Sequence, residues 1–222
     1  MRTLGQIRKL KETQRSVPNR RDRRKLATRQ VLLDATQALL ASRSMDALSV
    51  DEIVMRADVA KGTFYNHFSD KDALARELAS HVRTRLENEI TRTNEGIDDP
   101  AQRIARAFCC VLRFCLGAPD QAAAMMKLFP RATDPAAPIN AGVRRDVADG
   151  LAQGRIVASS EDVAVACIVG VFMAGVNRAL DLSADRARKF AQELGAMLLH
   201  GLGLSHTQAM HMMREAVAAI LA

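Results

Sequence analysis

The chain has 222 residues, of which 48% are hydrophobic and 26% charged, so it can bury a core and is not disordered throughout. Its net charge of +7 is concentrated: residues 1–30 carry eleven arginines and lysines against Glu12 and Asp22, a net +9, which leaves −2 for residues 31–222. A basic end on a nearly neutral body indicates an anionic polymer as partner, since lysine and arginine beside phosphates release condensed counterions. A solvated arm that only aids solubility is the alternative.

Helix is favoured over strand, because long stretches rich in Ala, Leu, Arg and Met separate the prolines. These prolines stand at positions 18, 100, 119, 130, 135 and 138. We therefore predict an all-α fold. Residues 1–20 have no usable apolar stripe and are predicted to form a disordered basic arm. Residues 21–44 are predicted to form an amphipathic helix, with Leu26, Leu33 and Leu40 at helical spacing.

Two short helices joined by a tight turn are predicted next. Ser49 and Glu52 form a capping box, in which each side chain bonds the backbone N–H of the other residue, so a helix is expected over 49–57. Only residues 58–60 separate this helix from the segment Lys61–Phe68. Two short helices at this spacing are typical of a helix-turn-helix.

A long helix and six further helices are predicted to follow. Ser69 and Asp72 are expected to cap the long helix, which runs to about Arg92. Caps are also predicted at Ser159-x-x-Asp162 and Ser205-x-x-Gln208, and a proline-rich loop at 130–138. The six helices are expected at residues 101–116, 120–129, 139–152, 160–181, 185–202 and 206–221.

The segment Lys61–His67 is the predicted recognition helix. Placing residues 100° apart puts Phe64 and Phe68 on one inner stripe, about 40° from each other, and turns Gly62 and Asn66 outward. Asn66 can bond adenine edges, whereas the flanking polar side chains suit phosphates or a thymine methyl. These flanking residues are Lys61, Thr63, Tyr65 and His67. A short amphipathic helix with aromatic packing is the alternative.

At this stretch the sequence resembles a known family. Residues 28–74 are similar to the DNA-binding domain of TetR-family regulators. The landmarks that carry the resemblance are Arg29, Leu32, Leu33, Ala35, Ile53, Ala57, Val59, the run Lys61-Gly62-Thr63-Phe64-Tyr65-Asn66-His67-Phe68, Lys71 and Leu74.

The resemblance implies a DNA-binding domain over residues 21–70 and a larger helical domain for ligand binding and dimerisation over 71–222. It also implies which residues contact DNA. The family's contacts fall on Ser49, Lys61, Thr63, Tyr65, His67 and Lys71, with Thr28 as a further phosphate contact, and helical geometry adds Gly62 and Asn66. The sequence departs from the family's pattern at Ser44, Asp58 and Ala60, and the charge of Asp58 raises the prospect of an atypical operator.

The effector pocket implied by the resemblance is expected among Met and aromatic side chains, which can enclose an apolar ligand. The candidate residues are Phe108, Phe114, Met125, Met126, Phe129, Phe172 and Asn177. Arg106, Arg113 and Arg178 are candidate polar anchors beside Asn177, with a solvated helix surface as the alternative for the arginines and ordinary core packing as the alternative for each apolar residue.

A homodimer is expected to form through two helices, at residues 163–180 and 186–202, because the first is apolar on most faces and has small residues that permit close approach. A monomer core is the alternative. Two recognition helices about 34–36 Å apart would meet successive major grooves, so a palindromic or near-palindromic operator is expected.

The cysteines and histidines indicate no metal site, and no cofactor is expected. The four cysteines (Cys109, Cys110, Cys115 and Cys167) lie in apolar stretches without a C-x-x-C pair, so a reducing cytoplasm is expected and redox sensing is a minor alternative. The spacing of His200, His206 and His211 does not place two imidazoles on one helical face. Neither a signal peptide nor an apolar run of about 18 residues is expected, and therefore no membrane partner.

These features predict a ligand-responsive repressor that is released from its DNA operator by a small apolar or amphipathic effector. Two other classes were weighed. A small helical enzyme or carrier lacks a nucleophile–base pair, a metal cluster or a phosphate loop in the sequence. A sequence-indifferent DNA-compacting protein would need only the basic arm.

Overall fold

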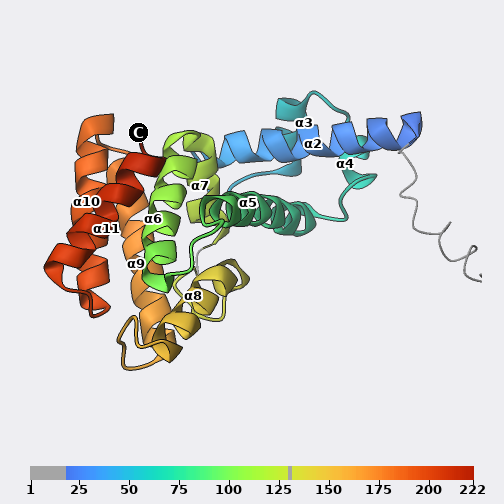
Figure 1. Cartoon of the computed structure of the whole chain (residues 1–222). Coiled ribbons are helices and arrows are strands. Elements are labelled where there is room, and N and C mark those ends of the chain that lie inside the picture. The colour runs from blue at the N-terminus through green and yellow to red at the C-terminus, as the bar shows by residue number, and fades with distance from the viewer. Residues whose placement is uncertain (1–18, 130–131) are drawn as a thin grey trace, which may run out of the picture.

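The computed structural model describes residues 19–129 and 132–222, and every regular element in this part of the chain is a helix (Figure 1). The predicted all-α fold is confirmed, while all but two residues of the predicted arm lie outside the described residues. The helices are α2 (Arg20–Leu40), α3 (Val50–Ala57), α4 (Lys61–Tyr65), α5 (Lys71–Thr93), α6 (Pro100–Leu116), α7 (Pro119–Leu128), a 3-10 turn (Pro138–Asn140), α8 (Ala141–Ala152), α9 (Glu161–Ala179), α10 (Ala184–Gly201) and α11 (His206–Ile220).

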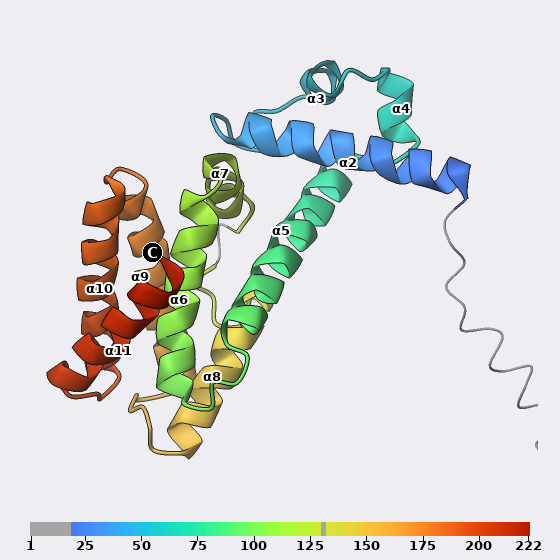
Figure 2. The same cartoon turned by 45° about the horizontal axis from the view of Figure 1, so that its top comes forward.

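The first three helices form one end of the molecule, and α5 leads from them to the larger helical body (Figure 2). Leu32, Leu33 and Leu40 of α2 are buried, and α2 packs against α3, α5 and α7. The spacing of Leu26 predicted that it belongs to the apolar stripe, but it is 58% exposed. Residues 20–27 of α2 are all exposed, because this end of the helix projects beyond the packed part.

Of the four predicted helix caps, two are confirmed and two are wrong by one residue. The capping boxes at Ser49 and Ser205 are formed with both reciprocal bonds. At α5, however, Asp70 is the cap and accepts a bond from the Ala73 backbone N–H at 2.6 Å. Ser160 likewise caps α9 in place of Ser159. In both cases the cap is the residue with an extended backbone immediately before the first helical residue, because a cap residue has a non-helical conformation.

In the helical body α6 is central and packs against α5, α7, α8, α9, α10 and α11. Its residues Ile104, Phe108 and Leu112 are fully buried. Gly175 of α9 allows this packing, since a Cβ at that position would lie 2.7 Å from the Phe108 ring. The core of the body therefore forms around α6, which is buried on most of its faces.

The expectation that no segment is long and apolar enough to span a bilayer is wrong for α9, which passes that test by length and composition. The helix packs against α6, α8 and α10. Val165, Ile168 and Phe172 are buried there, whereas Val163 on another face is 56% exposed. The apolar character of α9 thus reflects a buried face together with an apolar exposed face.

Candidate nucleic-acid interface and ligand cavities

The recognition helix has the two faces that its sequence predicted. Phe64 is fully buried and Phe68 is 3% exposed, with their ring centroids 5.7 Å apart. Tyr65 is 54% exposed, and Gly62 and Asn66 lie on the same open surface. Helix α4 ends at Tyr65, with Asn66 as its C-cap, so this reading surface is a short rigid turn anchored by two buried rings.

Asp58, in the turn before α4, adopts a left-handed conformation with φ of 52°, and among the described residues it is the one non-glycine with positive φ. Such a φ costs an ordinary L residue free energy but costs glycine almost none. Asp58 therefore bears a cost in folding free energy that a glycine at this position would avoid. Ala60, the next departure, provides no side-chain cap to α4.

We expect Asp58→Gly to raise the free energy of unfolding by about 0.5–1 kcal/mol, because it removes the cost of the left-handed conformation. Urea denaturation followed by circular dichroism measures the change. Asp58→Ala is the matched control and should be less stable than the wild type, since alanine lacks the side-chain oxygen that helps aspartate tolerate this conformation. A glycine variant no more stable than the alanine variant would contradict the prediction.

Arg29 joins the recognition helix to α5. Its Nε donates to Glu77 Oε1 at 2.5 Å, and its second terminal nitrogen also pairs with Glu77. Its Nη1 donates to the backbone oxygen of His67 at 2.6 Å, and its guanidinium lies 4.3 Å from the centre of the Phe68 ring. The carboxylate raises the pKa of Arg29, and the bond from Arg29 lowers the pKa of Glu77. One side chain therefore binds α2, the end of the recognition segment and α5 together.

Several predicted DNA contacts already have protein partners. Lys71 Nζ donates to the backbone oxygens of Asp46 and Leu48 at 3.1 and 2.8 Å, so it holds the loop before α3. Lys61 Nζ lies 2.8 Å from Asp51 Oδ1 on the open surface. The Ser49 hydroxyl is engaged in its capping box. In this structure Lys71 and Ser49 therefore hold the loop before α3 and the start of α3 in place. Lys61 remains on the exposed surface beside the reading residues.

A basic hollow of about 440 Å³ lies between α2 and the end of the recognition segment. It brings the predicted Thr28, Asn66 and His67 together with three cations that were not singled out as contacts. These are Arg21, Arg24 and Lys25. Their signal in the sequence was the excess charge of residues 1–30, and these three cations of that segment lie beside the reading surface.

His67 lines this hollow, and its surroundings favour the neutral imidazole over the charged one. Burial lowers its pKa, and the charges of Arg29 and Lys25 lower it further. Its Nδ1 is buried without a hydrogen-bond partner among the described residues. A neutral ring can donate one hydrogen bond to a phosphate but adds no charge to the basic hollow.

Two neighbouring hollows lie in the body among α5, α6, α7, α8 and α9. The inner cavity has a volume of about 50 Å³, and an outer groove of about 400 Å³ shares Ala132 and Ile139 with it. The inner cavity is lined by Leu86, Ile90, Val111, Met125, Ala132, Ile139, Asn140, Val143, Val169, Phe172 and Met173. It is an apolar chamber with one amide side chain.

Asn140, which the sequence did not single out, is 3% exposed and ties down the segment between α7 and α8. Its Nδ2 donates to the backbone oxygens of Ala132 and Asp134 at 2.7 and 2.8 Å. The same residue lines the inner cavity. Asn140 therefore lines the inner cavity and also holds Ala132, a residue that lines both hollows.

The predicted pocket residues are only partly brought together. Met125 and Phe172 line the inner cavity and Phe129 lines the outer groove. Phe108 lies behind Phe172 in the core, with ring centroids 5.1 Å apart. Two predictions did not hold: Asn177 is exposed, since five residues turn it about 140° away from Phe172 on α9, and Phe114 lines a different cleft. Met126 is half-buried and lines neither hollow.

The further polar anchors are also placed outside the cavity. Arg106 donates from Nε to the Thr93 backbone oxygen at 3.0 Å, Arg113 pairs with Glu89 at the surface, and Arg178 is exposed on α9. Each arginine has its charge in or near solvent. None of the three reaches the apolar chamber.

Burial accounts for the state of three cysteines. It raises the pKa of the Cys109 and Cys115 thiols to about 12, and it also raises the pKa of Cys110. These three groups stay protonated near neutral pH, and a protonated, buried thiol reacts slowly with oxidants. Cys167 lies exposed on α9.

An apolar surface runs along α9 and α10, the two helices predicted to form a dimer. Val163 is 56% exposed, Leu180 40% and Met197 74%. Cys167 and Ala174 are exposed between them along α9. We call these five residues the α9–α10 face.

Comparison with known proteins gives two family matches. Residues 32–78 match the family described as bacterial regulatory proteins, tetR family. Residues 99–215, more than half of the chain, match the tetracyclin repressor-like C-terminal domain. The two matches cover the recognition helix and the helical body separately.

Individual relatives are similar over shorter or longer stretches. The chain is 32% identical to the uncharacterized HTH-type transcriptional regulator YvdT of Bacillus subtilis over 31% of this chain and 35% of the relative. It is 28% identical to the HTH-type transcriptional repressor DhaR of a Mycobacterium species over 38% of this chain and 43% of the relative. It therefore matches less than half the length of each. The crystal structure of RolR in complex with resorcinol is similar over 86% of this chain and 95% of RolR, with 25% identity and a TM-score of 0.55.

Proposed function

Because the chain belongs to the tetR family of bacterial regulatory proteins, we propose that it is a homodimeric repressor released from DNA by a small effector. The family consists of DNA-binding transcriptional regulators rather than enzymes. We assign DNA binding to residues 21–70, effector binding and dimerisation to residues 71–222, and the protein to the cytoplasm. The repressor DhaR is among its relatives, over 38% of this chain.

One observation carries the proposal: α5 is common to the DNA-binding end and the effector cavity. Glu77, near its start, is paired with Arg29 beside the recognition segment. Leu86 and Ile90, further along the same helix, line the inner cavity. A displacement of α5 by a ligand in the cavity would therefore move the recognition helix. The ligand must bind the displaced state more tightly than the DNA-bound state for this to release DNA.

The chamber favours a small apolar or amphipathic effector. Its lining is apolar apart from Asn140. Because the Asn140 Nδ2 already donates both of its hydrogens, its Oδ1 is the atom that can accept a hydrogen bond from a ligand. At about 50 Å³ the chamber is small in this conformation, so a ligand has to widen it toward the outer groove at Ala132 and Ile139. RolR was crystallised with resorcinol, which makes resorcinol the first compound to titrate here.

DNA contact is assigned to the exposed face of the recognition segment and the basic hollow. Asn66 and Gly62 face outward for base edges, and Tyr65 and Lys61 flank them. Arg21 and Arg24 supply charge for the phosphates. In a two-fold dimer the operator is expected to be palindromic or near-palindromic.

The test is to select bound fragments from random DNA and then to titrate candidate effectors against the selected operator. Substituting Tyr65 and Asn66 by alanine should abolish operator preference, whereas a sequence-indifferent DNA-compacting protein would bind unchanged. The proposal fails if no sequence is enriched. The release mechanism fails if operator affinity is the same with and without every compound that demonstrably binds.

We expect Met197→Glu to convert the dimer into a monomer, because it places a charge within the α9–α10 face, at a residue that is 74% exposed in one protomer. Sedimentation velocity measures the change. Met55→Glu is the matched control, since Met55 is 79% exposed on α3, far from that face. The interface is misplaced if both variants remain dimeric.

A further inference from the structure

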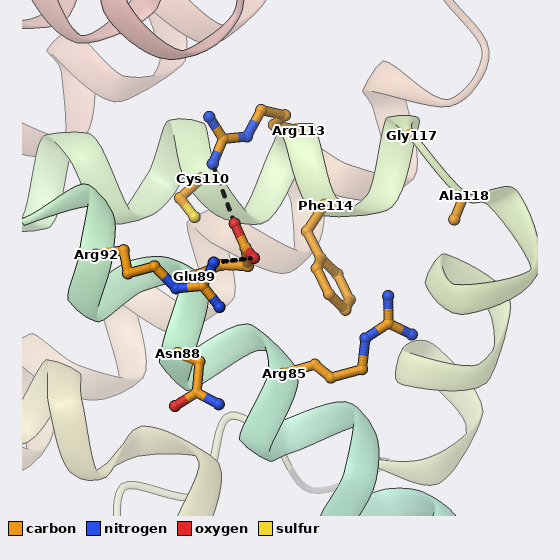
Figure 3. A pocket seen from close by; sticks show the side chains of 9 residues that line it. All are labelled: Arg85, Asn88, Glu89, Arg92, Cys110, Arg113, Phe114, Gly117 and Ala118. Carbon is orange, nitrogen blue, oxygen red and sulfur yellow. Dashed lines mark hydrogen bonds and ion pairs between the residues drawn. The ribbon is translucent and has the colours of Figure 1, made fainter. Parts of the chain in front are cut away.

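A further hollow lies between α5 and α6 and shares no lining residue with the effector chamber (Figure 3). It is a cleft of about 350 Å³. On α5 it is lined by Arg85, Asn88 and Arg92, whereas Leu86 and Ile90 of the same helix line the inner chamber. At 100° per residue these two sets face opposite sides of the helix. The cleft and the chamber are therefore separate sites.

Positive charge exceeds negative charge in this cleft. Three arginines line it, Arg85, Arg92 and Arg113, and among the described lining residues Glu89 is the one carboxylate. Arg113 Nη2 and Arg92 Nη1 each lie 3.5 Å from an oxygen of Glu89. One carboxylate is thus divided between two guanidiniums that come from two different helices. Long, exposed pairs of this kind contribute little stability, so an anion can compete for them.

The cleft also has an aromatic wall. The Phe114 ring lies beside the Arg85 guanidinium, which is 5.7 Å from the ring centre. In Figure 3 both side chains flank the open space that Arg113, Glu89 and Arg92 border from the other side. A planar ring stacks favourably on phenylalanine or on a guanidinium, and a guanidinium bonds a carboxylate through two parallel N–H groups.

We propose that this cleft binds a small planar organic anion. Its carboxylate is held by Arg113 and Arg92, one from α6 and one from α5, and its ring lies against Phe114. Asn88 offers an amide at the rim for a further polar substituent. The site is distinct from the effector chamber, and its occupancy does not depend on DNA binding or on repression.

The experiment titrates benzoate and, as its uncharged counterpart, benzamide into the full chain without DNA, using calorimetry or nuclear magnetic resonance. We expect benzoate to bind more tightly than benzamide. Arg113→Gln should weaken benzoate about threefold to tenfold, as expected for one charge-assisted hydrogen bond near solvent. Glu89→Gln should instead strengthen it, because the competing carboxylate is removed. Arg214→Gln, at an exposed position that does not line the cleft, should leave the affinity unchanged.

Loss of the fold would weaken benzoate binding in both variants. Opposite responses of Arg113→Gln and Glu89→Gln would therefore show that the substitutions act on a binding site. Circular dichroism verifies that each variant is helical. The proposal is overturned if benzoate and benzamide bind equally, if neither binds, or if benzoate binds and the two cleft variants leave its affinity unchanged. That last result would place benzoate outside this cleft. Operator binding without benzoate reports separately on the proposed repressor function.

Discussion

Arg29→Ala is expected to lower the free energy of unfolding by about 2–3 kcal/mol and to weaken operator binding at least tenfold. The side chains of Arg29 and Glu77 are 31% and 25% exposed, so their pair is partly shielded from water, and removing one partner leaves the other charge uncompensated. The variant also loses the bond to the His67 backbone and the stacking on Phe68. Urea denaturation and fluorescence anisotropy with operator DNA measure the two effects.

The matched control is Arg43→Ala in the same end of the molecule. Arg43 pairs with Glu52, but the two side chains are 43% and 37% exposed, and an ion pair open to solvent contributes about 1 kcal/mol at most. A cycle with Glu77→Ala and the double variant should give a coupling free energy above about 1 kcal/mol for Arg29 and Glu77. Equal losses in Arg29→Ala and Arg43→Ala would show that Arg29 has no special part in joining α2, the recognition segment and α5.

Much of the DNA-binding end could be predicted from local sequence, because its geometry is set by neighbouring residues. The helical period alone places Phe64 and Phe68 inside and Asn66 outside, and the capping box at Ser49 consists of residues three positions apart. The starts at Asp70 and Ser160 were predicted one residue early, since two adjacent polar side chains compete and only the backbone conformation decides between them.

The ligand cavities depended on contacts between distant helices and were predicted less well. Met125 and Phe172 line the chamber, but Phe114 faces the outer cleft, because periodicity gives a residue's direction on its helix and not the neighbour that it meets. Asn140 was missed because an asparagine after a proline-rich loop is typical of a turn. The importance of Arg29 was equally hidden, since its partner Glu77 is 48 residues away in sequence.

Val143→Phe is expected to weaken effector binding about a hundredfold while leaving operator affinity without effector unchanged, so that repression no longer responds to the ligand. Val143 lines the inner chamber from α8 and is half-buried. A phenyl ring at this position occupies the space of about 50 Å³ that a ligand has to enter, and the partial exposure of the residue limits the cost of overpacking to about 1–3 kcal/mol. Calorimetry with the effector and anisotropy with the operator measure the two affinities.

Val143→Leu provides a graded intermediate, and its effector affinity should fall between those of the wild type and the phenylalanine variant. Val157→Phe makes the same change at a residue that is 66% exposed and outside the chamber, so it should respond to effector as the wild type does. If Val143→Phe still releases DNA at the wild-type effector concentration, the effector binds elsewhere. The outer cleft with Arg113 and Phe114 would then be the site to test, because it too contacts α5 and could displace the recognition helix through Glu77 and Arg29.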